Sequence, residues 1–309
     1  MILAGVIVGL LLSATPAQND LQPQRIVAAS NVRLRAEPQT TADELTRLAL
    51  GTVLTQLEAS ADGTRYHVQT PEGKSGWVFA NLTEPFSERE STAVYRRIIQ
   101  SRLKAETLSF SDASDLFHFV ERITPQIQGP GRAEFDLFRL RALHRSLDQI
   151  MGYEPKDPAH RDWIKKHEDS LVYSEPAGQW LVKADLYWEL ETRNRGNPIA
   201  EEIAWDGATT GIPDECEGYI PCYFAVFLLS DARYLDVYPN GRHSEEAAEH
   251  IDYLLQEILK PNNPYTMDSR DFGELRESIA KLSTILDRSS ILKKTTLLTR
   301  LKRIEETYH

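Results

Sequence analysis

Two short stretches decide the fold of the amino-terminal part of the chain: Asn-Val-Arg-Leu-Arg at residues 31–35 and Gly-Lys-Ser-Gly-Trp-Val at residues 73–78. In the first stretch, apolar and polar residues alternate with a period of two, which is typical of a half-buried β-strand. In the second stretch, Gly73 and Lys74 complete a turn that begins at Pro71, and a strand pattern follows over residues 75–79. Both stretches therefore predict short strands that are connected by tight turns.

Three further strand patterns accompany these two. They cover residues 25–29, 48–57 and 65–70, and the second of them contains the turn residue Gly51. Five short strands at close spacing, separated by Gly and Pro turns, are typical of a small all-β barrel. The sequence therefore predicts a barrel over residues 25–85.

The order of these motifs resembles the bacterial SH3-like family. The family shows an Asn-Val-Arg opening, a Gly-led strand, an aromatic-x-Val strand and a Gly-Trp-Val close. This chain has them at residues 31–33, 51–53, 66–68 and 76–78. The resemblance implies a module that binds cell-wall peptide or protein and does not catalyse a reaction.

The resemblance also implies a set of ligand-binding residues. Trp77 is the expected platform, with Tyr66 and Phe79 beside it, although Tyr66 stands where many members carry Trp. Trp77 and Phe79 share strand parity, so one or both could instead close the barrel. His67 points away from Tyr66 along the strand, and we expect it at the surface.

The beginning of the chain predicts export. Residues 2–12 form an uncharged apolar run, and small residues follow at 13–17, as in a secretory signal. The run is too short to cross about 30 Å of hydrocarbon as a helix. No Lys or Arg precedes it, so either the signal is atypical or the true start lies upstream. A buried amino-terminal strand or helix is the alternative to a signal. We expect a signal segment at 1–17, a linker at 18–24, a periplasmic or secreted protein, and no integral membrane span.

The chain has two cysteines, Cys216 and Cys222. In an oxidising compartment an isolated close pair is expected to form a disulfide. Closing so short a loop would stabilise the fold by about 2.4 kcal/mol through the lost entropy of the unfolded chain. The spacing does not fit the Cys-x-x-Cys pattern of redox and zinc sites.

After Pro85 the apolar residues recur at helical spacing, which predicts an all-α domain over 86–309. Ser87 and Glu90 have the spacing of a capping box, and Asp157-Pro158 is a typical helix start. Helices are also predicted at 181–190 and 223–238. The predicted fold is therefore α+β and multidomain: a small SH3-like barrel followed by a helical, repeat-like domain.

A repeat is indicated by two Glu-Glu pairs, Glu201-Glu202 and Glu245-Glu246, which start 44 positions apart. Residues 234–247 combine a Tyr-Pro pair, small polar residues and a helix with an early Glu-Ala, and they resemble envelope proteins of the tetratricopeptide type. The resemblance covers about residues 178–260. It implies a helical surface that binds a protein partner.

The remaining patterns argue against several kinds of chemistry. A net charge of −11 disfavours nucleic acid as a partner, because phosphate binding needs clustered Lys and Arg. His243 and His250 lie seven positions apart rather than four, so no metal site is expected, and no motif predicts a cofactor.

Catalysis is likewise not expected. Two flanking carboxylates would raise the pKa of the Cys216 thiol and make it a poor nucleophile. The alternative is a cell-wall hydrolase with a helical catalytic domain that uses Glu201 and Glu202. Adjacent helical residues point about 100° apart, however, so these two carboxylates would not face each other.

Overall fold

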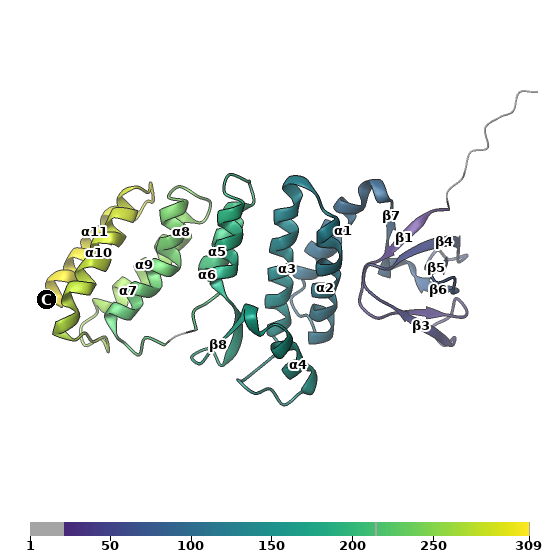
Figure 1. Ribbon diagram of the computed structural model, residues 1–309, viewed down its shortest axis with the longest axis horizontal. Coiled ribbons are helices and arrows are strands. Elements are labelled where there is room, and N and C mark those ends of the chain that lie inside the picture. The colour runs from purple at the N-terminus through teal and green to yellow at the C-terminus, as the bar shows by residue number, and fades with distance from the viewer. Residues whose placement is uncertain (1–21, 214, 309) are drawn as a thin grey trace, which may run out of the picture. The chain divides into compact units, whose positions relative to one another are not determined.

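The computed structural model describes residues 22–213 and 215–308, and the described chain divides into two compact units after Val94 (Figure 1). The expected signal segment 1–17 and residues 18–21 of the expected linker lie outside the described residues. The division into a β module followed by a helical region confirms the predicted fold class.

The amino-terminal unit is built on an antiparallel sheet with the strand order β3-β2-β6-β5-β4-β1-β7. The strands are β1 (Gln24–Val27), β2 (Val32–Arg35), β3 (Glu44–Leu48), β4 (Val53–Ala59), β5 (Arg65–Gln69), β6 (Ser75–Phe79) and β7 (Thr83–Phe86). Two of these, β3 and β7, are absent from the predicted set of five. Both lie at the edges of the sheet. Strand β3 is largely exposed and therefore needs no alternation of apolar residues, and β7 contains Pro85, which an edge strand tolerates.

The core of this unit consists of apolar residues that alternate along the central strands, and Val32, Leu34, Val68 and Val78 are fully or almost fully buried in it. Strands β2 and β6 approach each other closely at Gly76. A Cβ atom at Gly76 would lie 2.6 Å from the Arg35 carbonyl oxygen and 2.9 Å from Leu34 Cγ. The residue before Trp77 must therefore be glycine for the two strands to pair.

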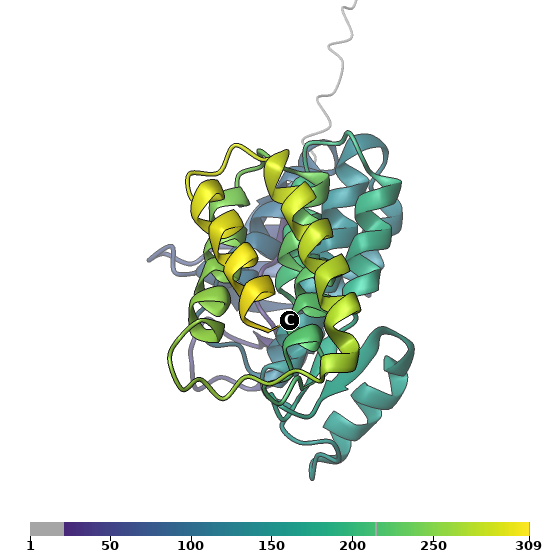
Figure 2. The ribbon, with the colours of Figure 1, turned by 90° about the vertical axis from the view of Figure 1, so that its left-hand side faces the viewer.

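The second unit, from Tyr95 onward, is mainly helical. Its helices are α1 (Ser91–Leu103, which begins in the first unit), α2 (Phe110–Ile123), α3 (Arg132–Leu147), α4 (Pro158–Lys166), α5 (Ala184–Arg193), α6 (Ala200–Thr209), α7 (Ile220–Leu229), α8 (Asp231–Val237), α9 (Ser244–Ile258), α10 (Phe272–Asp287) and α11 (Lys294–Thr307). Successive helices form antiparallel pairs that follow one another through the unit (Figure 1). Figure 2 shows the last pair, α10 and α11, side by side.

Three local predictions for this unit need correction. The region is not all-α, because a hairpin of β8 (Leu171–Ser174) and β9 (Gln179–Val182) occupies the expected start of the helix at Leu181. A short apolar run does not distinguish strand from helix, and Gly178 at φ 62° makes the turn between the two strands. The helix expected over 223–238 is two helices that meet at Ser230.

The helix starts agree with the sequence in one of two cases. Asp157 accepts a hydrogen bond from the Ala159 amide at 2.8 Å and caps α4, as predicted. The Ser87 side chain makes no capping bond, and a 3-10 turn at Glu88–Glu90 precedes α1. The capping-box prediction is therefore wrong.

Cys216 and Cys222 lie at disulfide distance, with their Cα atoms 5.4 Å apart. The loop that they close packs on the segment between α9 and α10. Gly218 accepts a hydrogen bond from the Thr266 amide, and the Thr266 carbonyl accepts one from the Ile220 amide, at 2.9 and 3.0 Å. The disulfide therefore holds the start of α7 in the shape that contacts this later segment.

The close approach at Gly76 gives a first prediction. Gly76→Ala should destabilise the amino-terminal unit by about 1–3 kcal/mol, because the added methyl group overlaps the Arg35 carbonyl. The loss of stability is measured by urea unfolding of the full chain. Hydrogen exchange of the β2 and β6 backbone amides then locates it in the amino-terminal unit. Ser75→Ala on the exposed side of the same strand is the control. Equal stability of the two variants would contradict the prediction.

The disulfide gives a second prediction. Cys216→Ser and Cys222→Ser should each lower the stability by about 2 kcal/mol, and the double variant should lose little more, because either single change opens the loop. Thermal unfolding of the three variants is the measurement. A catalytic Cys216 would instead give an asymmetric pair, in which only Cys216→Ser removes an activity.

Candidate functional site

A row of four side chains crosses the outer face of the barrel. Arg35, Trp77, His67 and Glu58 lie directly opposite one another on neighbouring strands β2, β6, β5 and β4. Residues that oppose each other in antiparallel strands project from the same face of the sheet. The row therefore places an indole and an imidazole side by side, with a cation at one end and a carboxylate at the other.

The centre of the row is an aromatic stack. The His67 and Trp77 rings lie 5.0 Å apart at 21°. His67 Nδ1 is 3.4 Å from Glu58 Oε1, and Arg35 Nη1 donates to the Ala42 carbonyl at 2.6 Å. Trp77 is half-buried, so part of its ring is open to a ligand. His67 and Tyr66 point to opposite faces of the sheet, as expected. The position of His67 beside Trp77 depends on the strand register, which cannot be read from the sequence.

Phe79 extends the same face. It is opposite Arg65, whose guanidinium lies 3.8 Å from the centre of the Phe79 ring, and the ring is 36% exposed. Arg65 itself is buried and donates to Thr40 Oγ1 at 3.0 Å. Phe79 and Trp77 thus lie on one surface, as their shared parity predicts.

Tyr66 does not belong to this surface. It is opposite Val78, on the face that packs against the barrel core, and the Arg25 guanidinium lies 4.1 Å from its ring centre. Of the three expected ligand-binding residues, the structure therefore brings Trp77 and Phe79 together and separates Tyr66 from them.

The two carboxylates of the hydrolase alternative both have structural partners. Glu201 Oε1 accepts from the Tyr234 hydroxyl at 2.9 Å and from the Arg242 amide. Glu202 Oε1 accepts from Arg141 at 2.7 Å. Burial by itself raises the pKa of Glu202, but the hydrogen bond and charge of Arg141 outweigh it and hold the pKa below its ordinary value. Neither carboxylate is arranged as a general acid.

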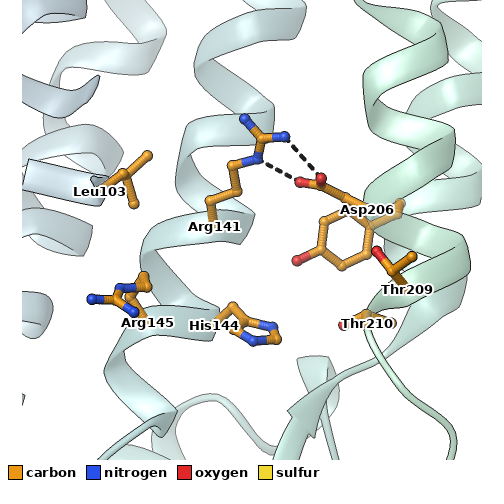
Figure 3. A pocket seen from close by; sticks show the side chains of 8 residues that line it. Leu103, Arg141, His144, Arg145, Asp206, Thr209 and Thr210 are labelled. Atoms are coloured by element: carbon orange, nitrogen blue, oxygen red, sulfur yellow. Dashed lines mark hydrogen bonds and ion pairs between the residues drawn. The ribbon is translucent and has the colours of Figure 1, made fainter. Parts of the chain in front are cut away.

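A cavity of about 290 Å³ lies between α3, α5 and α6. Figure 3 shows Arg141 and Asp206 pointing toward each other on its wall, and Arg141 Nε is 2.5 Å from Asp206. The Thr209 and Thr210 hydroxyls donate to backbone carbonyls, and burial raises the pKa of the Tyr187 hydroxyl. These three hydroxyls are therefore engaged in hydrogen bonds or held protonated, and His144 also lines the cavity.

The histidines considered for metal binding serve other contacts. His243 stacks on Trp205 with ring centres 4.5 Å apart, and His250 Nδ1 is 2.9 Å from Asp231 Oδ1. Across residues 22–213 and 215–308, no cluster of three or more His, Cys, Asp and Glu side chains is arranged to hold a metal ion. Within the same ranges, none of the helices combines the length and apolar character that crossing a membrane requires.

Residues 30–84 match the family described as Bacterial SH3 domain. This match confirms the predicted SH3-like barrel, and the row of Arg35, Trp77, His67 and Glu58 lies within it. No curated protein matches the chain. The family match lies within the amino-terminal unit and does not reach residues 178–260.

The lowered pKa of Glu202 gives a third prediction. A carboxylate whose pKa is lowered by folding stabilises the fold at pH values above its ordinary pKa. This contribution is lost as the pH falls through the lowered pKa. Glu202→Gln should therefore lower the free energy of unfolding by about 1–2 kcal/mol at pH 7 and by clearly less near pH 4. This value takes into account that the pair with Arg141 is partly exposed. Urea unfolding at both pH values is the measurement.

Glu277→Gln is the matched control, because Glu277 is an exposed helical carboxylate with no ion pair in the described structure. Its effect should be small at both pH values. A cost for Glu202→Gln that does not depend on pH would contradict the ionic role of Glu202.

Proposed function

We propose that this protein is a non-enzymatic binding and scaffold protein of the cell envelope. Its barrel binds cell-wall peptide or an envelope protein, and its helical unit, with a tetratricopeptide-like part at about 178–260, binds a protein partner. The observation that carries the proposal is the row of Arg35, Trp77, His67 and Glu58 on a module of the bacterial SH3 type.

The chemistry of this row suits a peptide. A half-exposed indole offers a flat apolar surface, and Phe79 enlarges it. The guanidinium at one end complements a carboxylate, and the carboxylate at the other end complements an ammonium group. Both groups occur on peptides, and the open surface suits an extended ligand.

The proposed compartment is periplasmic or extracellular. The disulfide supports it, because such bonds persist in oxidising environments. The apolar run at residues 2–12, read as a signal segment, supports it independently. The helical pairs α5–α6 and α8–α9 support a repeat-like partner surface, since each Glu-Glu pair lies in the first turn of the second helix.

The barrel proposal gives a fourth prediction. Trp77→Ala should weaken binding to purified wall material at least about tenfold, because a central tryptophan is typically worth 2 kcal/mol or more at a binding surface. Co-sedimentation with insoluble wall material measures the affinity. Tyr66→Phe is the control, since Tyr66 lies on the opposite face of the sheet and should bind unchanged.

The same samples test the absence of catalysis. The soluble fraction should contain no wall fragments after prolonged incubation with the full chain. Released fragments that disappear with Glu201→Gln or Glu202→Gln would favour the hydrolase alternative and contradict the proposal.

A further inference from the structure

A cavity of about 220 Å³ lies in the helical unit where the start of α5, the end of α6 and the junction of α7 and α8 meet. Its apolar wall includes Gly207, Ala208, Gly211 and Leu229. A second cavity of about 340 Å³ runs along α5 and shares three lining residues with the first: Asp185, Trp188 and Arg233. The shared residues make the two cavities neighbours.

The wall of the first cavity holds a buried donor without an acceptor. Trp188 is 2% exposed, and its Nε1 has no hydrogen-bond partner in the described structure. The glycine at position 207 lies next to this nitrogen, and a Cβ there would be 3.3 Å from it. A buried N–H without an acceptor destabilises the fold, so a ligand carbonyl that accepts a hydrogen bond from it would remove that cost.

The boundary of the two cavities holds a cation without a counter-ion. The Arg233 guanidinium lies over the Trp188 ring, 4.3 Å from its centre, and is half-buried. Within residues 22–213 and 215–308, no carboxylate lies at ion-pair distance from it. The other cation on this wall, Lys183, donates to the Asp169 carbonyl at 2.9 Å. Stacking on Trp188 orients the planar fork of Arg233, which suits a carboxylate.

We propose that this cavity binds the carboxyl-terminal residue of a peptide that ends in a small apolar side chain. The terminal carboxylate pairs with Arg233, the preceding carbonyl accepts from Trp188 Nε1, and the side chain packs against Gly207, Ala208 and Leu229. Asp185 offers an acceptor for a peptide N–H. The inference rests on the proposed partner-binding role of the helical unit, to which it gives a place and a ligand chemistry.

The test uses the full chain and N-acetyl-trialanine, as the free acid and as the carboxyl-terminal amide, in calorimetric titrations. The free acid should bind at least about tenfold more tightly than the amide, because only the acid forms a charge-assisted pair with Arg233. Arg233→Gln should remove this preference, and Trp188→Phe should weaken both peptides. Arg276→Gln is the matched control, since Arg276 also stacks on an aromatic ring, at 4.6 Å from Phe272, but lines neither cavity.

Three outcomes would overturn the proposal: equal affinities for acid and amide, an unchanged preference in Arg233→Gln, or no binding of the acid at millimolar concentration. Circular dichroism identifies a Trp188→Phe variant that fails to fold, and the Arg233→Gln result then decides. Trp77→Ala should bind trialanine like the parent protein. Loss of trialanine binding in Trp77→Ala would mean that the peptide binds to the barrel, which would contradict the cavity proposal. Unchanged wall binding in the same variant would contradict the proposed barrel function and leave the cavity result unaffected.

Discussion

The helical unit depends on one contact, in which the Glu201 carboxylate holds the turn between α8 and α9 against the start of α6. Tyr234 and the Arg242 amide donate to this carboxylate, and the His243 amide donates to the Tyr234 hydroxyl at 3.1 Å. A side chain at position 241 would displace groups of this contact, because a Cβ at Gly241 would lie 2.4 Å from the Tyr234 hydroxyl and 2.7 Å from Glu201 Oε1. The Tyr-Pro-Asn-Gly segment is thus shaped to fit the helical pair before it.

Neighbouring pairs are connected in the same way elsewhere in the unit. The Tyr238 hydroxyl donates to Glu191 on α5 at 2.9 Å. Burial by itself raises the pKa of Glu191, but hydrogen bonds from Arg195 and Tyr238 outweigh it and hold the pKa below its ordinary value. An ion pair of Arg141 with Glu202 joins α3 to α6. Asp252 on α9 pairs with Lys293, directly before α11, and with Arg300 on α11. Each of these contacts joins side chains of two different elements and therefore favours one relative position of those elements.

The barrel can be predicted from the sequence patterns, whereas the row of side chains on its outer face cannot. Alternation along β2, β5 and β6 predicts the core because each inward residue is apolar. The row from Arg35 to Glu58 depends on which residues of different strands face each other, and this register includes an irregularity in β4 near Gln56. For the same reason, residue type alone groups Tyr66 with Trp77, although the strand pairing puts Tyr66 on the other face. The β8–β9 hairpin cannot be predicted from its apolar residues, because these residues also fit a helix.

The residues of the hydrolase alternative and those of the binding proposals differ in how far neighbouring groups engage them. The residues considered for catalysis are engaged: Cys216 lies in a disulfide, and Glu201 and Glu202 accept hydrogen bonds from neighbouring elements. The groups on which the binding proposals rest are of another kind, namely an indole face at Trp77, a buried indole N–H without an acceptor at Trp188 and the guanidinium of Arg233. Such groups stack, donate and attract charge, but they do not transfer protons at neutral pH. The proposed role in binding rests on this difference between the two sets of groups.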